Sequence, residues 1–403
     1  SRHFQAQCPQ PGVHRWQRCL APARRSHSCG TSTMALARLP SNFGRIRDVA
    51  QLPVGTLTLG QLMRNTRPDP ESLLAVGRWL HAQLPIRLAR RIEDCLQLPH
   101  VVVSNPHINQ VLSNYLSTFD AVSAFPEIRT PEDEAAFCSL VKEELSKHLH
   151  GTRQIAEGYR QVRQAYPHIH LDGFLNNFFV ARIASRILME NYVQMREPRE
   201  GYVGVVRQGM RPLCVLQGLA GSLEQLTREM YSCAPAVIIQ GNLDCLLDYI
   251  PRHVWCMVRE LLKNALRATA ERHCARRAGD QDARLPPVVV ELQQGDVHVI
   301  IKISDQGGGM AKDVQQLAWK YGWTTADDRT PGSRLDLAGY GFGLPLTRLH
   351  AQYFGGDLFM QAIPGHGTNM YLLLTHLKEG TPSTEIDDLS TVLYREERGG
   401  RSA

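Results

Sequence analysis

The hydrophobic pattern of this 403-residue chain changes its period once, and that change limits the fold class. Across residues 57–195, apolar side chains recur every three or four positions, which is the spacing of helices that bury one face. The stretch 196–201 is polar and contains proline and glycine. Beyond it, runs such as 288–292 and 297–304 are strand-like and are separated by a Gly-Asp turn. The sequence therefore predicts an α+β protein, with a helical bundle followed by a domain that contains a sheet.

Several elements have recognisable starts and ends. Thr130 is followed by proline and three acidic residues, which is the composition of a helix N-terminus. We expect helices at 70–84, 84–92, 105–125, 130–166 and 171–195, and later at 252–273, 311–320 and 346–354. We expect strands at 288–292, 297–304, 356–363 and 369–374, with the helices packed on one face of a mixed sheet.

The start of the chain differs in composition from the rest. The first acidic residue is Asp48, and eight arginines precede it among Ser, Ala and Cys. An arginine-rich leader without acidic residues is typical of an organelle transit peptide, so we expect a mitochondrial transit segment. The alternative is an unselected extension, with Met34 as the true start. The leader, helical domain, second domain and polar tail have the expected bounds 1–45, 46–200, 201–380 and 381–403.

Composition excludes several classes of protein. With 43% hydrophobic residues, the chain is long enough for two cores. The net charge of +6 is small for this length, so charge does not predict nucleic-acid binding. The ten cysteines are scattered without zinc-type spacing, and we expect reduced thiols. No apolar run reaches the roughly eighteen uninterrupted residues that would predict a membrane-spanning helix.

Three segments of the second half carry residues suited to binding a nucleotide. Glu260, Asn264 and Arg267 are four and then three residues apart, so on a helix they share one face. That face offers a carboxylate, an amide oxygen and a cation to a common ligand. Asp305 precedes three glycines, so its carboxylate can accept a hydrogen bond from a purine amino group where no Cβ obstructs close approach. A second glycine cluster, at 339–345, supplies backbone N–H groups for phosphate.

Each segment alone has an ordinary interpretation as a solvated helix face, a loop or a turn. In this order and spacing they match the N, G1 and G2 boxes of the GHKL ATP-binding superfamily, which the chain resembles. Within that superfamily it is similar to the mitochondrial kinases of 2-oxo acid dehydrogenase complexes. The closer resemblance rests on LPIRLARRI at 84–92, FLNNFFVARIASRIL at 174–188 and GYGFGLPLTRLHAQYFGGDL at 339–358.

The resemblance implies a GHKL (Bergerat-type) α/β sandwich that binds ATP and Mg²⁺. It implies that Asn264 coordinates the metal, that Asp305 accepts the adenine amino group, and that Gly341 and Gly343 contact phosphate at a helix start. The segment 323–337 resembles a lid over the nucleotide. The nucleotide-binding residues implied in this way are Asn264, Arg267, Asp305, Gly307, Gly309, Thr324, Thr325, Gly339, Gly341, Phe342, Gly343, Leu344 and Thr368.

Two residues are candidates for catalysis. By the same resemblance, Glu260 is the general base that accepts the proton of an incoming serine hydroxyl, and the alternatives are a metal ligand or an exposed helix acid. His148 matches a family histidine thought to orient that glutamate, and the alternative is a surface histidine on a charged helix. The residues around His148 lack the HExxxP pattern of histidines that are autophosphorylated.

The resemblance also implies an activity, partners and a location. It implies a protein serine kinase of the mitochondrial matrix that phosphorylates and inactivates the E1α subunit of a 2-oxo acid dehydrogenase. LAGYGFGLPLTRL favours the pyruvate complex, whereas residues 125–141 and the lack of an Asp-Trp tail favour the branched-chain complex. A homodimer and docking to the lipoyl domain of the E2 core are implied too. Two features depart from the family pattern. Gln306 stands where the family commonly has arginine, and the Asp-Trp tail is missing, since the last tryptophan is Trp323.

Two other classes remain open on the sequence. A histidine autokinase would carry acid-labile phosphate on itself. A nucleotide-gated binding module would bind ATP without transferring phosphate. Eukaryotic-type and P-loop kinases are excluded, because the chain has no HRD, DFG or Walker lysine motif.

Overall fold

The computed structural model describes residues 39–55, 69–274, 285–325 and 340–377, without the side chains of 39–42 and of Cys274. The expected tail and most of the expected leader and lid therefore lie outside the described residues. Helix α1, Leu39–Ala50, begins inside the segment expected as a leader. Its Ile46 is buried in the core of the helical region.

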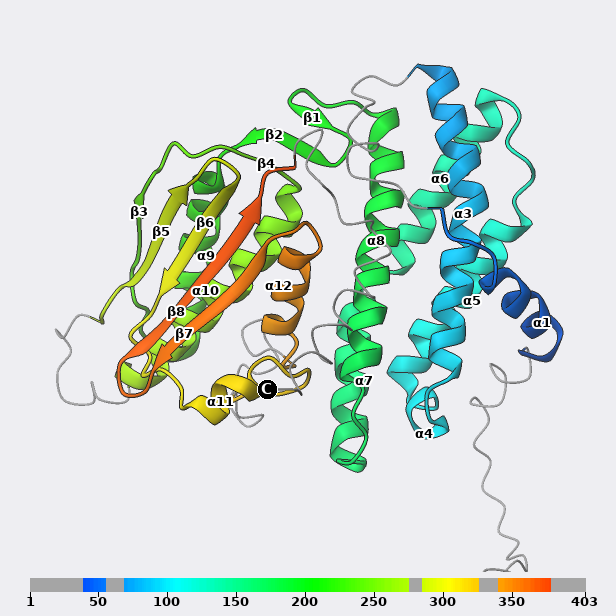
Figure 1. The fold of residues 1–403 in the computed structure, drawn as a ribbon. Coiled ribbons are helices and arrows are strands. Elements are labelled where there is room, and N and C mark those ends of the chain that lie inside the picture. The colour runs from blue at the N-terminus through cyan, green and yellow to red at the C-terminus, as the bar shows by residue number, and fades with distance from the viewer. Residues whose placement is uncertain (1–38, 56–68, 275–284, 326–339, 378–403) are drawn as a thin grey trace, which may run out of the picture. The chain divides into compact units, whose positions relative to one another are not determined.

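The first half of the described chain is helical (Figure 1). The helices that follow α1 are α3 (Pro70–Leu96), α4 (His100–Val103), α5 (Pro106–Ala124), α6 (Pro131–Lys147), α7 (Gly151–Ala165) and α8 (Asp172–Arg196). Helix α3 packs against α5, α6 and α8, and α5 packs against α7. The helices bury a continuous apolar core, which includes Phe119, Phe137 and Phe178. The expected helical bundle is confirmed.

Helix α3 corrects one expectation. The sequence predicted two helices that meet at residue 84, because a proline usually stands near a helix start. Instead Pro85 lies inside one helix of 27 residues, Pro70–Leu96. A proline inside a helix removes one backbone hydrogen bond. Burial of Leu84, Ile86 and Leu88 on either side of it keeps the chain helical, so packing outweighs the local signal.

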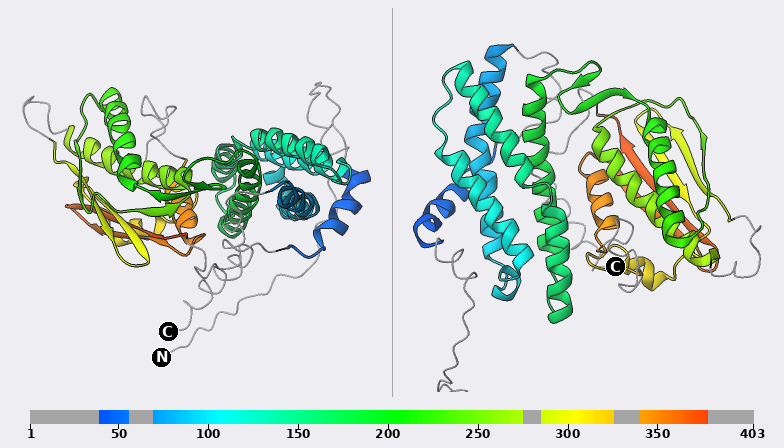
Figure 2. Two further views of the ribbon diagram at one scale, coloured as in Figure 1. Left: turned by 90° about the horizontal axis from the view of Figure 1, so that it is seen from above. Right: turned by 180° about the vertical axis from the view of Figure 1, so that it is seen from behind.

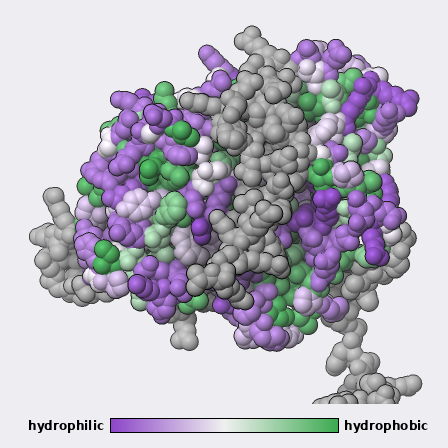
Figure 3. Space-filling model, viewed as in Figure 1, coloured by the Kyte–Doolittle hydropathy of each residue, from purple (hydrophilic) through white to green (hydrophobic). Residues whose placement is uncertain are grey.

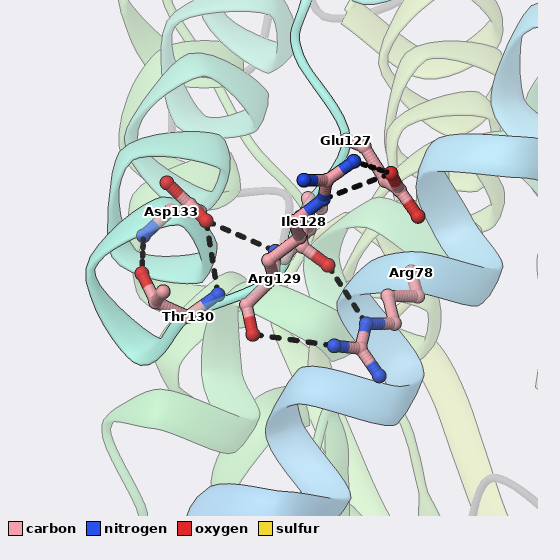
Figure 4. A network of polar contacts seen from close by, with 6 residues as sticks. All are labelled: Arg78, Glu127, Ile128, Arg129, Thr130 and Asp133. Atoms are coloured by element: carbon pink, nitrogen blue, oxygen red, sulfur yellow. Dashed lines mark hydrogen bonds and ion pairs between the residues drawn. The ribbon is translucent and has the colours of Figure 1, made fainter.

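The start of α6 was read correctly from the sequence (Figure 4). Thr130 Oγ1 accepts from the Asp133 N–H at 3.2 Å, and Asp133 Oδ2 accepts from the Thr130 and Arg129 N–H groups at 2.9 Å. This reciprocal pair is a capping box. The guanidinium of Arg78 on α3 binds the carbonyl oxygens of Ile128 at 2.7 Å and Arg129 at 3.2 Å. These two hydrogen bonds from Arg78 attach the loop before α6 to α3.

The continuous helix expected over 130–166 is wrong. Helix α6 ends at Lys147, and α7 begins only at Gly151. His148 has φ −90° and ψ 2° at the C-cap of α6, and its carbonyl accepts from the Gly151 N–H. The guanidinium of Arg182 on α8 donates to the same carbonyl, so a tertiary contact stabilises the turn.

The second half holds two sheets. The smaller has the order β1-β2-β4, and the larger has the order β3-β5-β6-β8-β7. In the larger sheet β3 runs parallel to β5 and the other pairs are antiparallel, so the sheet is mixed as expected. The strands are β1 (Tyr202–Val203), β2 (Val206–Met210), β3 (Val237–Gly241), β4 (Leu247–Tyr249), β5 (Val288–Gln294), β6 (His298–Ser304), β7 (Asp357–Ile363) and β8 (Gly367–Thr375).

Helices cover one face of the larger sheet, as expected (Figures 1 and 2). They are α9 (Pro212–Tyr231), α10 (Pro251–Cys274) and α12 (Gly343–Gln352), and the short α11 (Lys312–Leu317) follows the turn after β6. Alternate strand residues such as Val290, Ile301 and Leu372 are fully buried beneath these helices. The sequence missed α9 and β1 to β4, and it placed the start of α12 three residues late.

Aromatic side chains join the helical half to the second half. The Tyr321 ring stacks on Phe179 of α8 with centroids 5.8 Å apart, and Phe342 lies 5.1 Å from Tyr321. The Tyr321 hydroxyl donates to Asn176 Oδ1 at 2.8 Å, and Asp172 Oδ1 accepts from the Tyr321 N–H at 3.2 Å. The segments that flank the candidate site are therefore held against α8.

Two sequence expectations concern chemistry outside the site. The side chains of five described cysteines are free, but Cys233 is disulfide-bonded. The expectation that the cysteines are reduced thiols is therefore wrong at Cys233. Within the described ranges, no helix has the length and apolar character of a bilayer span.

Candidate functional site

A cavity of about 480 Å³ lies beside α10 in the second half. That volume is in the usual range for a small-molecule site. One face of α10, the turn after β6, the start of α12 and strands β7 and β8 line it. The lining residues are Glu260, Leu261, Lys263, Asn264, Ala265, Arg267, Ala268, Glu271, Arg272, Asp305, Gly307, Gly309, Met310, Ala318, Trp323, Thr324, Thr325, Gly341, Gly343, Leu344, Pro345, Met360, Thr368 and Met370.

Helix α10 brings Glu260, Asn264 and Arg267 to one side of this cavity, as their spacing predicted. The Asn264 side chain makes no hydrogen bond to the described part of the chain, so its amide oxygen is available to a ligand. Arg267 Nη2 donates to Thr325 Oγ1 at 2.9 Å, and Arg267 Nε lies 3.1 Å from Glu271 Oε1. Helix α10 therefore contributes both a free acceptor and an oriented cation.

Asp305 comes directly after β6, and its carboxylate is oriented by backbone donors. Oδ1 accepts from the Gly307 N–H at 2.8 Å and from the Thr368 N–H at 3.3 Å. Both donors bind Oδ1, and within the described ranges Oδ2 has no hydrogen-bond partner. Burial raises the pKa of Asp305, and the two N–H groups oppose that rise. The site thus presents one oriented acceptor that has lost most of its water.

The glycines around Asp305 are required by close approach. Gly309 has φ +63°, and a Cβ there would collide with the carbonyl oxygens of Ile363 and Gly367. A Cβ on Gly307 would lie 2.8 Å from the Ala268 carbonyl carbon and closer still to its Cβ. The turn is therefore wedged between α10 and the β7–β8 hairpin, where no side chain fits.

The second glycine cluster lies at the start of α12. Gly341 has φ +75°, and a Cβ there would collide with the backbone of Trp323. Helix α12 begins at Gly343, and its first N–H groups have no helical partner, so this end favours an anion. A Cβ on Gly343 would overlap Glu260 Oε2. The carboxylate of Glu260 therefore lies directly against the start of α12, at the end of the cavity that favours an anion.

Glu260 is close to two cations. Its Oε2 lies 2.6 Å from Lys263 Nζ, and its Oε1 lies 3.6 Å from Arg259 Nη1. The Glu260 side chain is 23% exposed, so a protein substrate can reach it. A partly exposed carboxylate beside a helix start that favours anions can accept a proton from a hydroxyl group that approaches there.

The structure does not bring His148 to Glu260. His148 is buried in the helical region and is absent from the cavity lining. Thr118 Oγ1 donates to Glu144 Oε2 at 2.7 Å, so His148 Nε2, 2.9 Å from Oγ1, carries a proton and donates it to Thr118. Burial, aided by Arg182 and other cations, lowers the pKa of His148 to about 4. Among the described residues no contact joins His148 to Glu260, so this structure offers no direct path for the orienting role that the resemblance implies.

Two other expected site residues need comment. Phe342 is absent from the lining, because its ring packs against Tyr159, Phe179 and Tyr321 toward the helical half. An aromatic ring between glycines was read as part of the phosphate loop, but it anchors that loop instead. Gly339 and the expected lid beyond Thr325 lie outside the described residues, whereas Thr324 and Thr325 do line the cavity.

Several lining residues were missed from the sequence. Met360 of β7 and Met370 of β8 are register partners and form an apolar wall near Asp305. Their alternation with outward-facing residues was the available signal. Arg272 donates to the carbonyl oxygens of Gly365 and His366, which fixes the β7–β8 hairpin to α10. Lys263 was read as part of a helix and not as a partner of Glu260.

Comparison with known proteins agrees with this geometry. Residues 56–207 match the family described as mitochondrial branched-chain alpha-ketoacid dehydrogenase kinase, and residues 250–378 match the histidine kinase-, DNA gyrase B- and HSP90-like ATPases. A mitochondrial pyruvate dehydrogenase (acetyl-transferring) kinase of Arabidopsis thaliana is 33% identical over 77% of this chain and 87% of its own. The chain belongs to the mitochondrial 2-oxo acid dehydrogenase kinase family.

Relatives from distant organisms share this likeness. The mitochondrial pyruvate dehydrogenase kinase of Schizosaccharomyces pombe is 28% identical over 83% of this chain and 96% of its own. The Drosophila melanogaster kinase is 27% identical over 75% of this chain and 77% of its own. The expected GHKL fold is confirmed, since the ATPase match spans α10, the Asp305 turn and the start of α12. As in other kinases of this ATP-using family, the nucleotide is ATP.

Proposed function

We propose that this protein is an ATP-dependent protein serine kinase of the mitochondrial matrix that phosphorylates and inactivates the E1α subunit of the pyruvate dehydrogenase complex. One observation carries the proposal. A single cavity combines three features. The Asp305 carboxylate can accept a hydrogen bond from a purine amino group, helix α12 begins at Gly343, and the accessible Glu260 carboxylate lies beside that helix start. The names of the relatives point to the same substrate complex.

The ends of the cavity suit the two ends of ATP. Asp305 Oδ2 accepts the adenine amino group, Thr368 adds a hydroxyl, and Met360 and Met370 cover the apolar faces of the base. The phosphates lie toward Gly341 and Gly343, where the N–H groups of α12 begin. Arg267 and Thr325 lie along the same lining.

The donors present fit a magnesium ion carried by the nucleotide. Among the described residues, no group of three or more His, Cys, Asp or Glu side chains can hold a metal. Mg²⁺ needs only one or two protein oxygens when phosphates and water complete its shell. The unpaired amide of Asn264 supplies one such oxygen. When bound, the ion neutralises charge that develops on the phosphates.

Transfer itself requires a proton acceptor. Glu260 takes the proton of the substrate serine, the serine oxygen forms a bond to the γ-phosphorus, and the bond from that phosphorus to the bridging oxygen breaks to release ADP. The exposure of Glu260 allows the serine to approach, and the N–H groups at Gly343 lie where the transferred group passes.

The proposal includes a homodimer and docking to the lipoyl domain of the E2 core. The face of the large sheet that no helix covers carries exposed apolar residues, Ile238, Phe359 and Ile363. Figure 3 shows hydrophobic patches among hydrophilic ones on the sheet side of the molecule. Such a face suits pairing with a second copy.

A second candidate substrate is the branched-chain 2-oxo acid dehydrogenase. It is favoured by the helical half, because residues 56–207 match the family described for that kinase. The test is direct. The protein, with ATP and magnesium, is incubated beside purified pyruvate and branched-chain dehydrogenase complexes, and the phosphate on each E1α is measured together with dehydrogenase activity.

Two variants make this test specific. E260Q should abolish transfer and retain ATP binding, whereas H148Q should leave transfer within about threefold of wild type. Acid-stable phosphate on serine of one E1α supports the proposal. Acid-labile phosphate on the kinase itself would support a histidine autokinase, and ATP binding without transfer to either complex would support a binding module.

A further inference from the structure

Lys263 is a buried cation with one polar partner. Its side chain is only 4% exposed, it lines the cavity, and Nζ lies 2.6 Å from Glu260 Oε2. Within the described part of the chain, Glu260 is the polar group that satisfies this ammonium. A buried lysine without such a partner is strongly disfavoured, so the two side chains constrain each other. Water screens this pair less than it screens an ordinary solvent-exposed i,i+3 contact on a helix.

We propose that Lys263 is a positioning residue for phosphoryl transfer, which holds the Glu260 carboxylate against the start of α12. The inference rests on the proposed function and names a residue that sequence reasoning overlooked. Lys263 binds Oε2, the same oxygen that would overlap a Cβ on Gly343. Oε1 is then left for the proton of the incoming serine. In this role Lys263 acts through Glu260 and is not itself a ligand of the substrate or of the transferred group.

A second cation competes for Glu260. Arg259 Nη1 lies 3.6 Å from Oε1, and its guanidinium stacks 5.6 Å above the ring of Trp255, which is 46% exposed. Arg259 therefore draws the carboxylate toward the protein surface, whereas Lys263 draws it toward the cavity. The distances of 2.6 Å and 3.6 Å show that Lys263 prevails. Removal of the Lys263 charge should therefore let the Glu260 carboxylate pair with Arg259.

The buried position of Lys263 explains why a lysine serves here. The Lys263 side chain is only 4% exposed, and its ammonium lies 2.6 Å from Glu260 Oε2. The i,i+3 spacing places both side chains on one face of α10. A carboxylate displaced by about 1 Å from the reacting hydroxyl can lose about 100-fold in rate.

The test uses K263M, which keeps the apolar stem and removes the charge. Steady-state transfer to E1α should fall roughly 10- to 100-fold in kcat, while the dissociation constant for ATP, measured by calorimetry, changes less than about threefold. K142M is the matched control, because it removes a Lys–Glu pair of the same 2.6 Å length, with Glu197, and neither residue lines the cavity. Its kcat should stay at the wild-type value.

A double-mutant cycle separates positioning from general damage. If Lys263 acts only through Glu260, the residual single-turnover rate of K263M/E260Q equals that of E260Q alone. An additive loss would overturn the proposal. A fall in ATP affinity of tenfold or more with kcat unchanged would also overturn it, because Lys263 would then be a phosphate ligand.

One readout does not depend on the substrate. A crystal structure of K263M should show the Glu260 carboxylate paired with Arg259 and withdrawn from Gly343. If the carboxylate keeps its wild-type position, Lys263 does not position it, whatever the activity. Failure of the proposed function has a different signature, since wild-type protein would then transfer no phosphate while the displacement of Glu260 is still observed.

Discussion

Arg267 of α10 donates a hydrogen bond of 2.9 Å to Thr325, although 58 residues separate them in the chain. The bond ties the middle of α10 to Thr325, the last described residue at the start of the expected lid. Glu271, 3.1 Å from the other side of the guanidinium, orients it. The segment that follows Trp323 is therefore connected to the same helix that carries Glu260 and Asn264.

Removal of the Thr325 hydroxyl should weaken ATP binding. T325V keeps the side-chain shape and deletes the acceptor, so the dissociation constant for ATP should rise roughly 3- to 10-fold, the effect of one hydrogen bond. Titration calorimetry measures it. T227V is the control, because it deletes a hydroxyl that bonds only within α9. Equal affinities for T325V and wild type would show that the contact does not order the site.

Asp305 should make adenosine binding sensitive to acid. The amino group of adenine binds the ionised carboxylate, so affinity is lost as the pH falls through the pKa of Asp305, which burial raises. Adenosine has no phosphate, which keeps phosphate protonation out of the measurement. D305N should bind adenosine roughly 10- to 100-fold more weakly at neutral pH and lose the acid dependence. A wild-type affinity that is constant from neutral pH to about pH 4 would contradict this role.

Gly309 and Gly365 should differ sharply on substitution by alanine. Both have positive φ, so each alanine pays about 1 kcal/mol or more in backbone strain. A Cβ at 365 meets nothing within 4 Å, whereas one at 309 collides with two carbonyl oxygens. G309A should therefore lose ATP binding and several degrees of melting temperature, and G365A should keep ATP binding. Calorimetry and thermal unfolding of both variants decide it.

His148 should lower stability in mild acid. Its pKa is about 4 in the folded protein and near 6.5 when exposed, so the unfolded state takes up a proton first. The contribution of His148 is fully present above about pH 6.5 and is lost at about 1.4 kcal/mol per pH unit as the pH falls toward 4.

Urea unfolding between these pH values measures the effect. His350, whose pKa burial also lowers to about 4, titrates in the same window, so the informative quantity is the difference between wild type and H148Q. H148Q should show the flatter pH dependence. Parallel curves for the two proteins would contradict the burial of His148.

The helix starts and strand runs with strong local signals were correct from the sequence. Thr130 and Asp133 satisfy each other across one helical turn, so their role needed no tertiary contact. Pro85 gave an equally clear local signal that failed, because packing of the surrounding leucines and isoleucine against neighbouring helices outweighs one lost hydrogen bond. Strands β1 to β4 were missed because they are short, and some of them lie at sheet edges with little alternation.

The sequence by itself determined which residues of a single helix or turn lie together on the side that faces a ligand. Glu260, Asn264 and Arg267 share a face through helical periodicity, and the glycines beside Asp305 and Phe342 mark backbone that must approach closely. Only the tertiary structure decided what those elements face. It placed His148 in the helical core, turned Phe342 toward α8, and buried the Lys263 side chain beside Glu260. Burial depends on contacts between segments far apart in the chain, which no local pattern encodes.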